Sequence, residues 1–427
     1  MAPARPPRSN RSIRLTPRGK AFGVLSIVLA VFAYAGGNRV LLAAACLLFA
    51  LTLMAVVLAR FRSLNLSLER SFAPSSVAAA STTTVTIDTA NLASISSAPL
   101  YWNDTLPWRP LATNPAHLGS LAGPSGSRSR RHARLSYELS PPRRGVFGIG
   151  PFAVAYSDPF GLAVGFMTVG KTSELIVTPH VAELPSSGVW LEAPDGTARL
   201  VQATGIGNSD DLMTREYRRG DALRRVHWRA SARHGQLMVR QEEQRVYPEA
   251  TIVVDTREAG YTDYWGTAHL TQSWGENSDG FEWAVSMLAS VGVHLHRAGF
   301  VVHVVETSET QIAGLADAEA RAGREEDFLL SLARIRLQKA SGRPSAAAAD
   351  GPVFAIISTP DADTLEWLLA LRRPFELGVV FLVGASRRVA GELSLAGWRV
   401  IPVDTYVDPV VAWRVLAEEL GATSVNR

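Results

Sequence analysis

The nine residues TIVVDTREA, at positions 251–259, decide how the C-terminal part of this chain is expected to fold. Four consecutive β-branched residues lead directly into Asp255. A short apolar run of this kind predicts a buried strand. The strand would end at Asp255, so that Thr256, Arg257, Glu258 and Ala259 would form the loop that follows it.

Similar apolar runs recur further along the chain and alternate with stretches of helical pattern. We expect strands at 251–255, 300–305, 353–358, 378–383 and 398–402, and helices near 280–298, 319–338, 361–372, 387–395 and 408–420. Strands that alternate with helices predict a parallel, doubly wound α/β sheet. Residues 249–427 are therefore assigned to an α/β domain. Its aromatic insert from Tyr261 to Asp279 is expected either to pack over the sheet or to contact a partner.

Residues 61–200 show a different pattern, in which short alternating runs are separated by Gly, Pro and Asn. We expect strands at 82–87, 133–139, 152–156 and 174–178, a flexible loop at 113–132, and a turn at DPFGL, residues 158–162. β-branched residues at a period of two predict an antiparallel β-sandwich. The region contains no pattern of catalytic residues, which favours a spacer or docking module.

Two uncharged stretches near the N-terminus, 21–38 and 40–59, predict membrane-spanning helices. At about 1.5 Å per residue each has roughly the thickness of the hydrocarbon core of a bilayer. The GGNR sequence between them, residues 36–39, predicts a tight turn, so residues 21–60 are expected to form a transmembrane helical hairpin. A signal peptide cleaved after AYA, residues 33–35, is the alternative, but the second apolar stretch argues against it.

The excess of positive over negative charge in the chain lies in its first 20 residues. These form a basic tail with six Arg and Lys and no acid, so within the net charge of +4 the other 407 residues carry −2. The positive-inside rule then places both termini and the soluble domains in the cytoplasm. A body without excess positive charge argues against nucleic acid as a partner. The single cysteine, Cys46, lies in the second apolar stretch, which excludes a disulfide, a cysteine metal site and a Cys–His hydrolase.

The densest pattern of charges lies in residues 201–248, between the two soluble domains. Residues 210–243 contain eight arginines and six carboxylates, with the two signs interleaved. Such interleaving predicts a structural clamp of Arg–carboxylate pairs, with a partner surface or an anion site as the alternatives. The residues of this signature are Arg215, Glu216, Tyr217, Gly220, Asp221, Arg224, Arg225, His227, Trp228 and Arg233.

The signature run REYxxGDxLRRVHWxxxAR, residues 215–233, resembles a bacterial family known only as a domain of unknown function, number fifty-eight. The resemblance extends to DPFGL, to the N-terminal helices and to the C-terminal third. It implies a multi-pass membrane protein whose α/β domain is von Willebrand factor A-like. It also implies two partners, a MoxR-type AAA+ ATPase and a transglutaminase-like membrane protein. We expect an interaction or adaptor protein that is not an enzyme and has no cofactor.

The resemblance also identifies a degenerate ion site. In von Willebrand factor A-like domains the first strand ends in Asp-x-Ser-x-Ser, whose oxygens help to bind Mg²⁺. Here Asp255 is kept, but Arg257 and Ala259 stand at the serine positions, and a guanidinium would repel a divalent cation. Asp361 lies at another expected strand end, so a divalent-metal hydrolase using Asp255 and Asp361 remains an alternative. A receptor for anionic ligands that uses the signature arginines is another.

Overall fold

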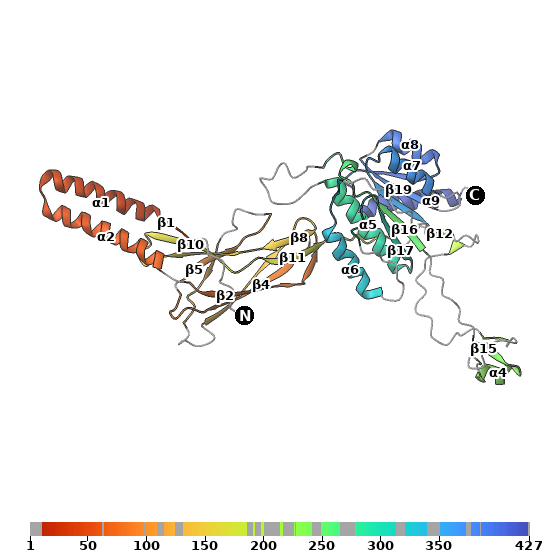
Figure 1. Ribbon diagram of the computed structural model, residues 1–427, viewed down its shortest axis with the longest axis horizontal. Helices are drawn as coiled ribbons and strands as arrows, with labels where there is room; N and C mark the ends of the chain where they lie inside the picture. Colours follow the sequence, from red (N-terminus) through yellow and green to blue (C-terminus); the bar gives the residue numbers. More distant parts are fainter. Residues whose placement is uncertain are drawn as a thin grey trace. The chain divides into compact units, whose positions relative to one another are not determined.

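The computed structural model describes residues 11–61, 64–97, 99–108, 115–123, 131–185, 191–192, 198–199, 214–216, 226, 228–240, 249–264, 278–312, 321–339, 351–372, 377–384 and 386–425. The described residues fall into two compact units (Figure 1). The first unit runs to His180, and the second begins at Val181. The predicted domain boundaries at 200 and 248 both fall within the second unit.

The first unit begins with a helical hairpin, α1 (Pro17–Gly36) and α2 (Arg39–Phe61). Gly37 closes α1 in the left-handed conformation, with a φ of 62°, which glycine adopts without strain. Both helices are long and apolar enough to cross a membrane, and few of their side chains are buried. Large apolar residues such as Phe32, Val40 and Leu47 are mostly exposed. The predicted pair of apolar helices at 21–60 is therefore present.

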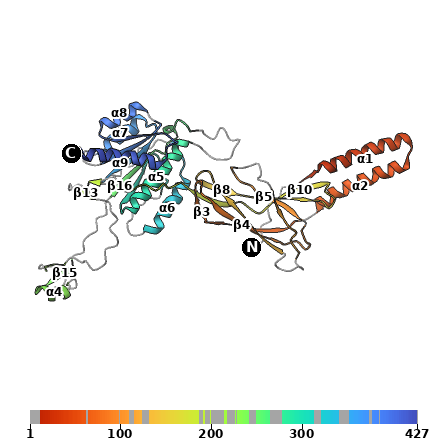
Figure 2. The same cartoon turned by 180° about the vertical axis from the view of Figure 1, so that it is seen from behind.

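Three sheets make up the rest of the first unit (Figure 2). Their orders are β1-β10-β9-β5-β6, β2-β4-β7 and β3-β11-β8, and only β3 and β11 pair in parallel. The strands are β1 (Ser12–Leu15), β2 (Leu66–Ala73), β3 (Ser76–Ala78), β4 (Thr83–Asn91), β5 (Leu100–Asp104), β6 (Ala116–Leu118), β7 (His132–Leu139), β8 (Gly145–Ile149), β9 (Phe152–Ser157), β10 (Ala163–Val169) and β11 (Ser173–Thr178). Their buried side chains form one core, in which Trp102 stacks on Phe152. The strands predicted at 82–87, 133–139, 152–156 and 174–178 are confirmed.

Two short strands lie in segments that were predicted as a basic tail and as a loop. β1 falls within the basic tail, residues 1–20, and pairs with β10. Its Ile13 and Leu15 pack beside the ends of the helices while Ser12 and Arg14 are exposed, so one side of this strand is covered. β6 falls within the predicted loop 113–132, where buried Leu118 pairs with Leu100 of β5. The predicted tail and the predicted loop therefore each contain a strand.

The second unit contains a five-stranded parallel sheet of order β17-β16-β18-β19-β20. Its strands are β16 (Glu249–Val254), β17 (Val301–Glu306), β18 (Val353–Ile357), β19 (Gly378–Val383) and β20 (Arg399–Val403). Its helices are α5 (Asp279–Arg297), α6 (Arg321–Arg334), α7 (Ala362–Leu371), α8 (Arg387–Leu395) and α9 (Pro409–Val425). Each predicted strand and helix of this region is confirmed to within a few residues, as is the parallel pairing.

Helices cover both faces of this sheet because successive strand residues point to opposite sides. Ile252 and Val254 belong to a core shared with α5, α6 and α9, whereas Val253 belongs to a core shared with α7 and α8. Residues 181–185 pack against the core that contains Ile252 and Val254. The Ala182 N–H donates to Ser290 Oγ, and the Trp413 indole donates to the Pro185 carbonyl. Residues 181–185 therefore belong to the α/β unit, although the sequence analysis had placed them in the β-rich region.

Smaller elements complete the second unit. They are β12 (Leu191–Glu192), β13 (Ala198–Arg199), β14 (Thr214–Glu216), α4 (Trp228–His234), β15 (Met238–Arg240) and the single turn η2 (Glu258–Gly260). β12 pairs with β13, and β14 pairs with β15.

Candidate functional site

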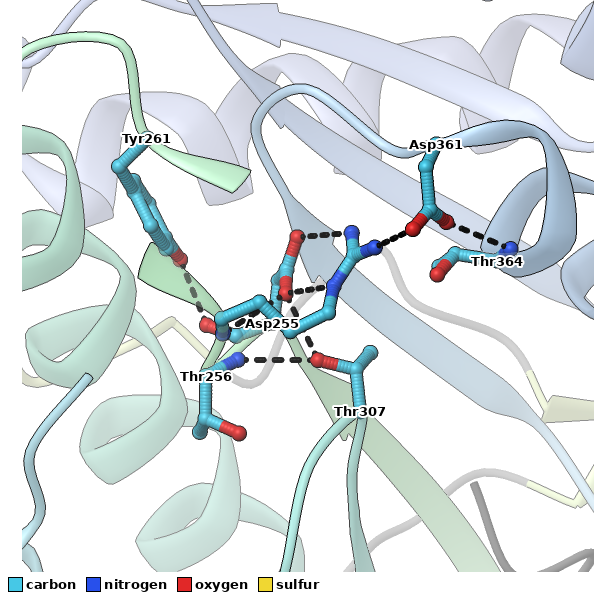
Figure 3. Close-up of polar contacts among 7 residues, drawn as sticks. Asp255, Thr256, Tyr261, Thr307, Asp361 and Thr364 are labelled. Atoms are coloured by element: carbon cyan, nitrogen blue, oxygen red, sulfur yellow. Dashed lines mark hydrogen bonds and ion pairs between the residues drawn. The ribbon is translucent and has the colours of Figure 1, made fainter. Parts of the chain in front are cut away.

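Polar side chains from three loops meet at the carboxyl end of the parallel sheet (Figure 3). Asp255 follows β16, Thr307 follows β17, and Asp361 lies between β18 and α7. Parallel strands end at the same edge, which is why residues more than 100 positions apart in the chain come together. β16 pairs with β17 on one side and β18 on the other, so the site lies where the strand order reverses, the usual ligand position in open α/β sheets.

Arg257 joins two carboxylates at this point. Its Nε lies 2.9 Å from Asp255 Oδ1 and its Nη2 lies 2.8 Å from Asp255 Oδ2, which is a bidentate pair. Its Nη1 lies 2.6 Å from Asp361 Oδ2. The guanidinium therefore stands between the two acids that the sequence analysis named as possible metal ligands.

The remaining hydrogen-bonding capacity of Asp255 is also used within the protein. Its Oδ1 accepts from the Thr307 hydroxyl at 2.7 Å and from the Arg257 backbone N–H at 3.1 Å. The Tyr261 hydroxyl donates to the Asp255 backbone carbonyl at 2.9 Å. A side chain at Gly260 would collide with the Asp255 carboxylate, so this position requires glycine. The Asp255 carboxylate is therefore buried and hydrogen-bonded within the chain.

The two neighbouring carboxylates keep Arg257 ionised. Asp255 and Arg257 are buried, whereas the side chain of Asp361 is 49% exposed. Burial opposes the charge of Arg257, but the hydrogen bonds and the attraction of Asp255 and Asp361 outweigh it and raise the pKa of the guanidinium. Burial also opposes the charge of Asp361, yet hydrogen bonds from Thr364 and the nearby guanidinium lower the pKa of this carboxyl.

This arrangement does not fit a divalent cation. A guanidinium has five donors and no acceptor, so it cannot be a ligand, and here it fills the space beside Asp255. Ala259 is exposed in η2 and contributes no oxygen. Within the described ranges, no group of three or more His, Cys, Asp or Glu side chains could hold a metal ion.

Sequence reasoning named Asp255, Arg257 and Asp361, and the structure brings them together. It missed Thr307, which bonds to Asp255 directly. The signal was present: Thr307 follows the strand expected at 300–305 just as Asp255 ends its own strand. The insert at Tyr261 is resolved in part, since Tyr261 is buried and packs edge-on against Phe281. Residues 265–277 of this insert lie outside the described residues.

The arginine-rich signature is described only in part. Tyr217, Gly220, Asp221, Arg224, Arg225 and His227 lie outside the described residues, so the predicted clamp stays a prediction. Arg215 and Glu216 belong to β14, opposite Val239 and Met238 of β15.

The short helix α4 follows β14 in the chain, and the residues of α4 and β15 differ in their exposure to solvent. Met238 is buried, and its N–H donates to Ser231 Oγ at 2.8 Å. Trp228, in contrast, is 69% exposed, and Arg229 and Arg233 are exposed with it. This part of the signature therefore presents an aromatic and two basic side chains outward.

Comparison with known proteins places one segment of the chain. The family described as "Protein of unknown function DUF58" matches residues 213–272, which include all of the signature residues together with Asp255 and Arg257. No curated protein matches the sequence. Among solved structures, the CARDB domain of a Pyrococcus furiosus protein is similar in a crystal structure with di-metal ions and in a solution NMR structure. The crystal structure is 12% identical, with 27% of this chain and 90% of that chain covered and a TM-score of 0.19; the NMR structure is 12% identical, with 26% and 93% covered and a TM-score of 0.18.

Proposed function

We propose that this protein is a DUF58 family member that α1 and α2 anchor in the cell membrane and that works in the cytoplasm as an interaction or adaptor protein without enzymatic activity. The observation that carries this proposal is the position of Arg257. In a von Willebrand factor A-like domain a divalent ion would sit beside Asp255 and take a partner's acidic group. Here the guanidinium binds both Asp255 and Asp361 from within the chain. The same contacts argue against a divalent-metal hydrolase built on these two acids.

The helical hairpin supports the membrane anchoring. Its large side chains are apolar on all sides and mostly exposed, which is unfavourable in water and suits lipid. Residues 11–61 contain no acidic residue. Their basic residues lie mainly at the end of the hairpin where the chain enters α1 and leaves α2. The positive-inside rule therefore favours a cytoplasmic position for the β-rich and α/β units.

The signature supplies the surface for a partner. Exposed Trp228 beside Arg229 and Arg233 is a combination that is enriched in binding hot spots and is complementary to an acidic surface. The resemblance to the family names a MoxR-type AAA+ ATPase and a transglutaminase-like membrane protein as partners. We assign the ATPase to this surface.

The partner assignment is tested by crosslinking in native membranes. A photo-crosslinking amino acid at position 228 should yield a crosslinked product that mass spectrometry identifies as the ATPase. Its yield should fall when Arg229 and Arg233 are both replaced by glutamine. A crosslinker at exposed Tyr406 of the α/β unit is the matched control and should not give the same product. Crosslinks from position 228 only within the chain itself would contradict the assignment.

The topology is tested with cysteines, because Cys46 is the only natural one. In a Cys46→Ala chain, a cysteine at Tyr406 should react with an impermeant thiol reagent only after the cells are opened. A cysteine at Asn38, in the turn between the helices, should react in intact cells. Labelling of position 406 in intact cells would sink the cytoplasmic assignment.

The proposal that the site at Asp255 binds no divalent metal is tested by calorimetry. Titration calorimetry of the purified full chain with Mg²⁺ should show no stoichiometric binding, because Arg257 already neutralises Asp255. Stoichiometric binding that disappears in Asp255→Ala would contradict the proposal and favour the hydrolase alternative.

A further inference from the structure

The DPFGL turn of the β-rich unit, residues 158–162, is fixed directly beneath the start of α1. The Thr16 N–H donates to the Leu162 carbonyl at 2.9 Å, and the Thr16 hydroxyl donates to the Gly161 carbonyl at 2.8 Å. A side chain at Gly19, in the first turn of α1, would collide with the Leu162 carbonyl. The turn and the helix are therefore in backbone contact.

The end of α2 is fixed to the same sheet. The Tyr156 hydroxyl donates to the Ala59 carbonyl at 3.0 Å. Ala55 and Ala59 of α2 pack against Leu162 and Ala163 in a small separate core. The depth of this end of the sheet is thus set by the two helices, so if they span a bilayer the DPFGL turn lies at its surface.

Hydrogen bonds within the turn hold its backbone, yet the turn presents an aromatic side chain outward. Asp158 is buried, and its two carboxylate oxygens accept from the Phe160 N–H at 2.7 Å and from the Ala163 N–H at 2.5 Å. Gly161 has a φ of 69°, which favours glycine. Phe160 itself is 48% exposed. The tight packing of the backbone therefore does not bury the ring.

Other exposed aromatic and basic side chains lie on the elements that meet at this end of the unit, α1, α2, β1 and β10. Phe61, at the end of α2, is 79% exposed, and Phe166 of β10 is 40% exposed. The guanidinium of Arg14 lies over the Phe166 ring, 5.8 Å from its centre. Arg18 and Lys20 are exposed in the first turn of α1. Aromatic rings mixed with Arg and Lys are typical of surfaces that lie in the interface of a membrane.

We propose that this end of the β-rich unit is itself a lipid-binding surface. Phe61, Phe160 and Phe166 enter the interfacial layer of the bilayer, and Arg14, Arg18 and Lys20 contact the phosphates of anionic lipids. The inference rests on the membrane anchoring proposed above. It adds that the soluble unit lies against the bilayer instead of standing clear of it.

Spin labels in the full chain test the depth of this surface. In a Cys46→Ala background, single cysteines at positions 32, 160 and 146 carry a nitroxide, and the protein is reconstituted in phosphatidylcholine vesicles with and without phosphatidylglycerol. Phe32 lies in α1, and Val146 is 41% exposed in β8, at the far end of the same unit from the hairpin (Figure 1). Collisions with oxygen and with a water-soluble nickel chelate then report lipid and water contact.

We expect the labels at positions 32 and 160 to collide more with oxygen than with nickel, and the label at 32 to lie deeper in the bilayer than the label at 160. The label at position 146 should collide mainly with nickel. A label at 160 that contacts mainly nickel, with the label at 32 in lipid, would overturn this inference and leave the anchoring intact. Shielding of position 160 from both reagents would also overturn it, because protein would then cover the ring. A label at 32 in water would overturn the anchoring itself.

A charge variant tests the role of anionic lipid. Replacing Arg14, Arg18 and Lys20 together by glutamine should increase nickel contact at position 160 in vesicles that contain phosphatidylglycerol. In pure phosphatidylcholine the change should be smaller. Arg134→Gln, an exposed arginine on β7, is the control and should have no effect. Equal behaviour of the triple variant and the parent in both vesicles would overturn the contact with lipid phosphates.

Discussion

Arg257 carries the only positive charge that contacts Asp255 among the described residues, and neither side chain has appreciable access to water. Removing one partner of a buried ion pair leaves the other charge uncompensated. We predict that Arg257→Ser lowers the free energy of unfolding of the α/β unit by about 3–5 kcal/mol. Urea unfolding followed by circular dichroism measures the change.

An exposed arginine of the same unit provides the control for this substitution. Arg388 pairs with Glu392 one helical turn away, and their side chains are 74% and 39% exposed. Arg388→Ser should cost no more than about 0.5 kcal/mol. Equal losses in the two variants would show that the guanidinium of Arg257 is not important to the stability of the site.

Asp361 has two separable roles, since it pairs with Arg257 and also caps α7 by accepting from the Thr364 N–H at 2.9 Å. Asparagine keeps the cap and removes the charge, whereas alanine removes both. We predict that Asp361→Ala is less stable than Asp361→Asn by about 1 kcal/mol, the usual worth of such a cap. Thermal unfolding of the two variants at neutral pH measures the difference.

The charge of Asp361 has a predictable pH dependence. Because its pKa is lowered in the folded protein, the carboxylate holds its proton less tightly there than in the unfolded chain, where its ordinary value is 3.8. Its stabilisation is therefore fully present above that value and is lost as the pH falls through the folded pKa. The stability difference between the parent and Asp361→Asn should be constant near neutral pH and shrink in acid. A difference that grows in acid would contradict the assigned pairing.

Arg257 and Thr307 show what sequence could and could not predict about the site. The Asp255–Arg257 contact is local, two positions apart, and both residues were named from the loop sequence. The contacts to Thr307 and Asp361 are separated by 52 and about 100 positions, so they depend on which strands become neighbours. Strand order is set by packing of the whole sheet, which no short pattern encodes.

At the scale of elements, Gly19 fixes the contact between α1 and the DPFGL turn, residues 158–162. A methyl group there would collide with the Leu162 carbonyl, whereas Gly23, one turn further, has nothing within 4 Å of its place. We predict that Gly19→Ala lowers the stability of the β-rich unit by about 1–3 kcal/mol through overpacking, while Gly23→Ala does not lower it. Thermal unfolding in detergent compares the two; similar behaviour would mean that the turn yields without cost.

Long apolar elements were predicted well because their burial dominates their local preference. The three central parallel strands, β16, β18 and β19, are almost fully buried, and their apolar runs were visible in the sequence. β1 and β6 were missed because three or four residues carry too little periodicity, and they become strands only by pairing with β10 and β5. The DPFGL turn was predicted as a turn, but its contact with α1 depends on the fold of the whole unit.

At the scale of the molecule, the chain consists of two units that each bury their own cores. Multidomain chains of this kind generally do not unfold in a single two-state step. We predict two unfolding transitions for the full chain in detergent, assigned by the variants above. Arg257→Ser should shift only the transition of the α/β unit, and Gly19→Ala only that of the β-rich unit.

The double variant completes this argument, because mutations at distant, independent sites change stability additively. In Gly19→Ala/Arg257→Ser each transition should move by the same amount as in the corresponding single variant. Differential scanning calorimetry at constant detergent and protein concentration resolves the two midpoints. A single transition, or a shift of both midpoints by either single variant, would show that the units unfold as one cooperative body. In that case the effect of Arg257 would reach the β-rich unit, and a partner that binds the α/β unit would change the stability of both.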